Sequence, residues 1–175
     1  MHILEIDIVK RTDRLTVPIT IPFNGKRKHF LKHLIETNGF QTMIEVGVDT
    51  GKSTFFLLDS IPNLKIYAID TNIKLFYNDT IKEKYGDRLI PIQGYSYNVA
   101  DQLPDNFADI VFIDADHSYE SVKKDILKYT PKLKERGLLT GHDIDYPGVN
   151  KAVKELINEF DVGPNFVWIK KQGKI

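Results

Sequence analysis

The sequence has no cysteine, so disulfide bridges and thiolate metal sites are excluded. It also has no net charge, because 24 basic residues balance 24 acidic ones, and nothing global draws it to nucleic acid or to an anionic membrane. No apolar run reaches the roughly 18 residues of a membrane span. Glu5, Asp7 and Lys10 interrupt the first residues, which therefore lack the hydrophobic run of a signal peptide. These absences predict a cytoplasmic protein without nucleic-acid or membrane partners.

Short runs rich in isoleucine and valine alternate with amphipathic stretches along a chain of 175 residues, which is long enough for a single core. The predicted strands are 42–46, 65–69, 89–92, 109–113 and 137–140. The predicted helices are 26–38, 54–60, 73–85, 119–129 and 149–160. This alternation predicts a Rossmann-like, doubly wound α/β fold, a mostly parallel sheet with helices on both faces. Ligands of such folds bind beyond the carboxyl ends of the strands.

The two ends of the chain fit this scheme less well. Residues 1–24, in which Pro18 and Pro22 bracket a β-like stretch, are predicted to form an N-terminal arm or lid, or a packing segment without a role in the site. Residues 25–175 form the domain itself. Near the C-terminus only 165–170 reads as a strand. The sheet then lacks an edge strand, takes one from residues 1–24, or is completed by a second subunit, which leaves a homo-oligomer open.

A glycine-containing turn, 43–53, joins the first strand to a helix and lets the backbone approach a ligand closely. Gly51, Lys52 and Ser53 match the end of a nucleoside-triphosphate loop, but Gly47 leaves one residue too few before Gly51 to encircle a phosphate. A nucleotide hydrolase or kinase is therefore the alternative function. A dinucleotide loop fails at two of its three glycines, and Asp49 would repel a pyrophosphate.

S-adenosylmethionine suits this turn better, because it carries no phosphate and its methionine end bears an ammonium group that Glu45 can attract. Asp70 ends the second strand, where a carboxylate can accept hydrogen bonds from ribose hydroxyls; the alternative is a helix cap. After the third strand, Tyr95 is placed to lie against adenine and Ser96 offers a hydroxyl, although Ser96 also suits the cap of a helix at 97–102. The turn resembles the first motif of class I methyltransferases: Glu45, Gly47 and Gly51 match, and Asp49 replaces the middle glycine.

Acidic and imidazole side chains follow the fourth and fifth strands, whose ends lie side by side in this fold. Asp114 follows the fourth strand, and His142 and Asp143 follow the fifth. Carboxylates and imidazoles that converge in this way suit a divalent cation, magnesium or manganese. We therefore predict Asp114, His142 and Asp143 as metal ligands. Structural alternatives are a bend at 141–143 and, for the basic run 26–28, either a solvated helix face or a contact for an anionic substrate.

The segments 112–119, 141–143 and 146–149 resemble methyltransferase family 24, which includes macrolide sugar O-methyltransferase relatives. The resemblance covers about residues 40–160 and implies transfer of a methyl group to a hydroxyl of a small molecule or sugar. In related enzymes the residue at Asp114 binds both cofactor and metal, and a basic residue stands at the place of His117. The resemblance therefore implies that His117 is the general base, with His142 as the second catalytic candidate. Two alternatives remain: His117 as a solvated loop residue, and a binding protein that keeps the fold without catalysis.

Overall fold

The predicted strands form one seven-stranded sheet in the order β3-β2-β1-β4-β5-β7-β6. The computed structural model describes residues 14–170. The strands are β1 (Thr42–Val46), β2 (Lys65–Asp70), β3 (Leu89–Gln93), β4 (Ala108–Ile113), β5 (Leu133–Gly141), β6 (Phe160–Val162) and β7 (Trp168–Lys170). The first five are parallel, whereas β7 runs antiparallel to both β5 and β6. The parallel order confirms the predicted doubly wound sheet.

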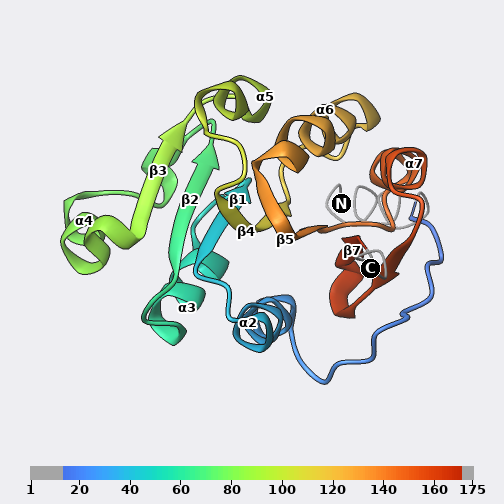
Figure 1. The fold of residues 1–175 in the computed structure, drawn as a ribbon, viewed down its shortest axis with the longest axis horizontal. Coiled ribbons are helices and arrows are strands. Elements are labelled where there is room, and N and C mark those ends of the chain that lie inside the picture. The colour runs from blue at the N-terminus through green and yellow to red at the C-terminus, as the bar shows by residue number, and fades with distance from the viewer. Residues whose placement is uncertain (1–13, 171–175) are drawn as a thin grey trace, which may run out of the picture.

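Helices cover both faces of the sheet, as Figure 1 shows, with α2 and α3 on one side and α5, α6 and α7 on the other. They are α2 (Arg27–Asn38), α3 (Lys52–Ser60), α4 (Asp79–Tyr85), α5 (Ser96–Val99), α6 (Tyr119–Tyr129) and α7 (Pro147–Leu156). Capping sets their bounds: Ser118 accepts from the backbone N–H of Ser121, and Gly39 ends α2 in the left-handed conformation. Within residues 14–170, no helix is long and apolar enough to span a membrane.

The core has two layers because neighbouring residues of a strand point to opposite faces of the sheet. In β1, Met43 packs toward the side of α2 and α3, and Ile44 toward the side of α5 to α7. In β4, Ile110 and Val111 divide in the same way. Strands buried on both faces explain why the sequence shows continuous apolar runs here rather than alternation.

Two of the predicted helices are wrong in extent. The stretch 73–85 is split into a short 3-10 turn, Ile73–Leu75, and α4, because the side chain of Asn78 accepts from the backbone N–H of Ile81 and starts a new helix. The helix predicted to reach residue 160 ends at Leu156, and Phe160 begins β6. Strand pairing of Phe160 with Lys170 overrides an apolar period that continues past the end of the helix.

The prediction of a single C-terminal strand is also wrong, since β6 and β7 form an antiparallel pair and β6 occupies the edge. Among the described residues, the edge strand is Phe160–Val162, and residues 14–24 of the N-terminal segment contribute no strand to the sheet. The described part of that segment, 14–24, runs along the edge instead (Figure 1): the backbone N–H groups of Thr20 and Ile21 donate to Val162 O. The rest of the predicted arm, residues 1–13, lies outside the described residues.

Two adjacent residues of α6 test the assignment of its buried face. Ile126 is 3% exposed and packs on the sheet, whereas Leu127 is 54% exposed. We expect Ile126→Ala to lower the free energy of unfolding by about 2–5 kcal/mol through loss of buried contacts and a residual cavity. Leu127→Ala should change it by no more than about 0.5 kcal/mol. Urea unfolding followed by circular dichroism measures both, and equal losses would contradict this placement of α6.

Candidate active site

Two neighbouring cavities lie at the carboxyl ends of the parallel strands. The larger, of about 530 Å³, reaches from Asp70 to the segment after β3, and the smaller, of about 300 Å³, reaches toward His117 and His142. Both are lined by Gly47, Asp49, Asp114 and Ala115. The turn after β1 and the end of β4 therefore form a wall that the two cavities share.

The turn after β1 needs glycine at both of its predicted positions. Gly47 has a φ of +87°, and a Cβ atom there would lie 2.2 Å from the carbonyl oxygen of Asp114. Gly51 has a φ of +76° and immediately precedes α3. Any side chain at position 47 would push the turn away from β4, so this glycine keeps the two sides of the shared wall in contact.

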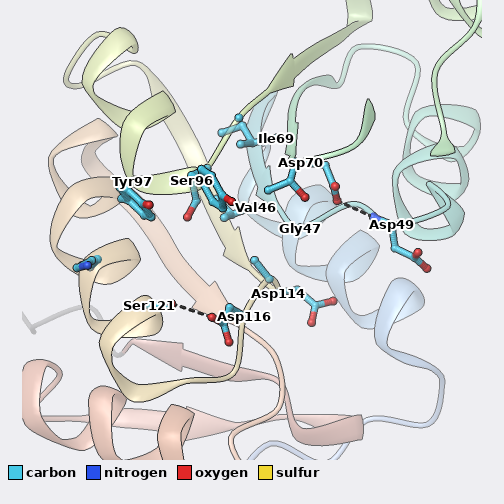
Figure 2. A pocket seen from close by; sticks show the side chains of 15 residues that line it. Val46, Gly47, Asp49, Ile69, Asp70, Ser96, Tyr97, Asp114, Asp116 and Ser121 are labelled. Carbon is cyan, nitrogen blue, oxygen red and sulfur yellow. Dashed lines mark hydrogen bonds between the residues drawn. The ribbon is translucent and has the colours of Figure 1, made fainter. Parts of the chain in front are cut away.

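Asp70 ties the turn after β1 to the one after β2. Its Oδ2 atom accepts from the backbone N–H groups of Val48 and Asp49, at 2.9 and 3.0 Å, and its Oδ1 atom accepts from Asn72 at 2.9 Å. Burial favours a higher pKa for Asp70, but these backbone hydrogen bonds lower it below its usual value. With a further backbone contact from Thr71, these bonds occupy most of the acceptor positions of the carboxylate, which lies at the edge of the larger cavity. Figure 2 shows the bond to Asp49 at the rim of the larger cavity.

Glu45 is buried in β1 beneath the turn and lines the smaller cavity. Its Oε2 atom accepts a 2.6 Å hydrogen bond from the hydroxyl of Thr54 in α3. Burial raises the pKa of Glu45 to about 7, although the Thr54 bond works in the opposite direction. Near neutral pH this carboxyl group is poised to become ionised when a cation approaches.

The segment after β3 forms the far wall of the larger cavity. Tyr95 is 62% exposed and stacks on Tyr97, with ring centroids 5.8 Å apart. Ser96, which Figure 2 places beside Tyr97 at the cavity, makes no helix cap. Its hydroxyl instead donates to Oδ1 of Asp125 in α6, at 2.5 Å. Sequence reasoning missed Asp125. Its position could have identified it, because it lies three residues after the buried Val122 and therefore on the same buried face of α6.

The smaller cavity holds the convergent acidic and imidazole groups that the sequence predicted. Asp114, His117 and Asp143 each offer one ligand atom, and these atoms lie within 4.8 Å of one another. His142 adjoins the same carboxylates: its Nδ1 atom is 3.4 Å from Asp114 and 3.0 Å from Asp143. That Nδ1 atom is buried and makes no well-aligned hydrogen bond. The structure thus brings two of the predicted ligands, Asp114 and Asp143, into a group that could hold a metal ion, with His117 in the place predicted for His142.

Strong electrostatic coupling sets the protonation of this cluster. Burial favours the neutral form of His142, but Asp114 and Asp143 outweigh it and raise its pKa to about 9. The hydrogen bond to Asp143, at 2.8 Å, raises the pKa of His117 as well. Burial favours a higher pKa for Asp143, yet the two histidines lower it well below its usual value. With a pKa of about 9, His142 is a cation at neutral pH, and His117 also holds its proton more tightly than a free imidazole does.

Two arginines also reach the cluster: Arg27, from the basic run noted in the sequence, and Arg14, which the sequence did not single out. Nη1 of Arg27, at the start of α2, lies 2.5 Å from Oδ2 of Asp114. Nη1 of Arg14 lies 2.6 Å from Asp145, and the guanidinium stacks over the ring of Tyr146. The basic run 26–28 was interpreted as a solvated face or a substrate contact, and Arg27 in fact neutralises a carboxylate of the site. No sequence pattern links Arg14 to residues so far along the chain.

Comparison with known proteins identifies the family. A model of the methyltransferase domain family matches residues 44–144, more than half of the chain. The chain belongs to this methyltransferase family. It is accordingly a class I S-adenosylmethionine-dependent methyltransferase, which removes the nucleotide hydrolase or kinase alternative. The matched residues include the turn after β1 and the acidic ends of β4 and β5.

Individual relatives are more distant. An uncharacterized protein of Acanthamoeba polyphaga mimivirus is 28% identical over 79% of this chain and 72% of its own. An O-methyltransferase from Bacillus cereus, in complex with SAH (S-adenosylhomocysteine), superposes with a TM-score of 0.66 at 16% identity, covering 97% and 88% of the two chains. A TDP-rhamnose 3'-O-methyltransferase of calicheamicin biosynthesis superposes with a TM-score of 0.62 at 17% identity, covering 85% and 82%. These superpositions show a shared fold.

The raised pKa of Glu45 predicts how stability of the methyltransferase depends on pH. The folded state binds this proton more tightly than the unfolded state does, so the Glu45 contribution to stability is lost as pH rises from 4.5 to about 7. Glu45→Gln removes that loss, and its stability relative to wild type should therefore improve from pH 5 to pH 8. Urea unfolding at both pH values measures this difference. The control is Glu135→Gln, which replaces an exposed carboxyl group on β5. If both variants gained the same stability relative to wild type between pH 5 and pH 8, the interpretation would be contradicted.

Proposed function

We propose that this protein transfers the methyl group of S-adenosylmethionine to a hydroxyl of a small molecule, with a sugar as the favoured class. The observation that carries the proposal is the pair of cavities with one shared wall. An elongated cofactor with its adenosine in the larger cavity and its methionine end at Gly47 would bring its sulfonium to that wall. The acceptor hydroxyl would then enter the smaller cavity, beside the acids and histidines.

The residues around the turn fit such a cofactor. Glu45 would hold the ammonium group, Asp70 one ribose hydroxyl, and Ser96 the base, while Gly47 and Gly51 let the backbone come close. No phosphate has to be accommodated, so Asp49 is compatible with this ligand. The raised pKa of Glu45 adds a consequence: an ammonium group beside it favours the ionised carboxylate, so binding near pH 7 releases protons.

The bound cofactor would supply an electrophilic methyl group attached to a sulfonium. The protein then has to align the acceptor oxygen with that methyl group and receive the hydroxyl proton. His117 suits the proton transfer through Nδ1, because its Nε2–H group donates to Asp143 and its ring is stacked on Tyr146, with centroids 4.3 Å apart. His142, with a pKa of about 9, suits the stabilisation of negative charge that develops on the acceptor oxygen.

A divalent cation fits the same cluster. Asp114 and Asp143 would supply carboxylate oxygens, and the third ligand would be the imidazole of His117 or, in its place, His142, a donor set that suits manganese and also admits magnesium. The histidine that binds the ion would then be a ligand and would leave the proton transfer to the other. Such an ion would displace protons from the histidines and compete with Arg27 for Asp114. Held there, it would lower the pKa of the acceptor hydroxyl. We include this metal in the proposal as an assistant to the transfer.

Cofactor binding is the first test. We expect S-adenosylmethionine and S-adenosylhomocysteine to bind to the wild-type protein, and Asp70→Ala to weaken both at least about tenfold, because it removes the ribose contact and releases the turn. Isothermal titration measures both dissociation constants. Asp59→Ala, which removes a carboxylate that contacts Lys84 and Tyr85 away from the cavities, should bind like wild type.

The outcomes separate the alternatives. A wild-type protein that binds neither compound would overturn the proposed function. Binding of both, without methyl transfer to any member of a panel of sugar and aromatic hydroxyl compounds, would instead identify a binding protein that has lost catalysis. Transfer is measured as S-adenosylhomocysteine formed per enzyme.

Manganese binding tests the metal. Titration calorimetry at pH 8 should detect manganese on the wild-type protein and lose it in Asp114→Ala and Asp143→Ala, which each remove a charged ligand. Asp116→Ala is the control, since that carboxylate bonds to Ser118 and Ser121 instead. Unchanged binding in Asp114→Ala would discard the ligand assignment. His117→Ala and His142→Ala then show which imidazole completes the site.

A further inference from the structure

The serine at the far wall of the larger cavity is held from one side by α6. The Ser96 hydroxyl donates to Oδ1 of Asp125 at 2.5 Å, and the hydroxyl of Tyr129, one turn further along the helix, donates to the backbone carbonyl of Ser96 at 2.7 Å. Asp125 is 1% exposed and Tyr129 is fully buried. Both the side chain and the backbone of Ser96 are thus fixed by buried groups that do not line the cavity themselves.

The Ser96 hydroxyl can offer a ligand only a hydrogen-bond acceptor. A serine hydroxyl has one proton to donate and two lone pairs that accept. Because the proton of Ser96 is committed to Asp125, its oxygen can only accept from a group in the cavity. Burial raises the pKa of Asp125 to about 6, and the charge of Asp116 acts in the same direction, so Asp125 is an ionised acceptor at pH 8 and cannot return a proton.

We propose that Asp125 fixes Ser96 as a hydrogen-bond acceptor, and that this acceptor selects a cofactor whose base carries an exocyclic amino group, adenine, over one with a carbonyl at that position, hypoxanthine. The inference rests on the proposed binding of S-adenosylmethionine in the larger cavity. An amino group satisfies the Ser96 oxygen. A carbonyl in its place leaves two acceptors facing each other without a proton, which is an unpaired buried contact on both sides.

Asp125 is therefore a positioning residue that determines specificity through Ser96. The test compares the affinity of S-adenosylhomocysteine with that of S-inosylhomocysteine, its deaminated counterpart, by isothermal titration at pH 8. Wild type should favour the adenosyl compound at least about tenfold, the equivalent of one lost hydrogen bond with its desolvation. The ratio of the two dissociation constants is the quantity that matters, because a general loss of structure weakens both ligands alike.

Two variants change that ratio in different ways. Asp125→Leu frees the Ser96 hydroxyl to rotate and donate, so binding of the inosyl compound should improve relative to the adenosyl one until the ratio is within about threefold of unity. Ser96→Ala removes the acceptor and should reduce the ratio through weaker binding of the adenosyl compound. It also keeps the test available if Asp125→Leu does not fold. Asp101→Asn, a nearby surface carboxylate that pairs with Lys128, should keep the wild-type ratio.

The outcomes are distinguishable. No binding of S-adenosylhomocysteine to wild type contradicts the proposed function itself. Binding with a wild-type ratio retained in both Asp125→Leu and Ser96→Ala contradicts this inference and leaves the function standing. A collapsed ratio in these variants, with the control unchanged, supports the assignment of Asp125.

Discussion

The organisation of this protein follows from one electrostatic constraint, the gathering of carboxylates at one edge of a parallel sheet. Because β1, β2, β4 and β5 run in the same direction, Glu45, Asp70, Asp114 and Asp143 all come near that edge. Like charges so close together raise one another's pKa unless each finds a partner. The different partners they find give the two cavities their different chemistry.

The partners of each carboxylate decide what it can still offer to a ligand. Asp70 is satisfied by backbone N–H groups, which keep it ionised and use most of its acceptor positions. Glu45 has a neutral hydroxyl as its partner and is left close to its protonated form. Asp114 and Asp143 have basic partners: His142 contacts both, Arg27 contacts Asp114, and His117 and Arg14 contact Asp143. The backbone-bonded Asp70 thus suits ligand binding, whereas Asp114 and Asp143, with their histidine partners, suit proton transfer or metal binding.

Local sequence patterns predicted most of the fold and correctly placed Asp70, Asp114 and Asp143 at the carboxyl ends of the parallel strands. Strands buried on both faces and α6, whose bounds match the prediction, carry strong apolar signals. The errors occurred where tertiary contacts decide: Phe160 continues a helical apolar period and yet pairs with Lys170. The partners of the site were less accessible to sequence reasoning. Arg27 and Asp125 act across long stretches of chain, and only the folded arrangement shows that each neutralises or orients a residue of the cavities.

The contact between Gly47 and Asp114 connects the binding and reacting halves of the site. A direct displacement is sensitive to the distance and angle between the two reactants. With the binding mode proposed above, both would depend on how closely the turn after β1 approaches the end of β4. The absence of a side chain at Gly47 brings that turn onto the carbonyl of Asp114, while the carboxylate of the same residue meets Arg27 and His142. If the cofactor and the acceptor bind as proposed, a movement of either group would shift one relative to the other. In the proposed arrangement, the end of β4 is therefore the reference from which both reactants would be positioned.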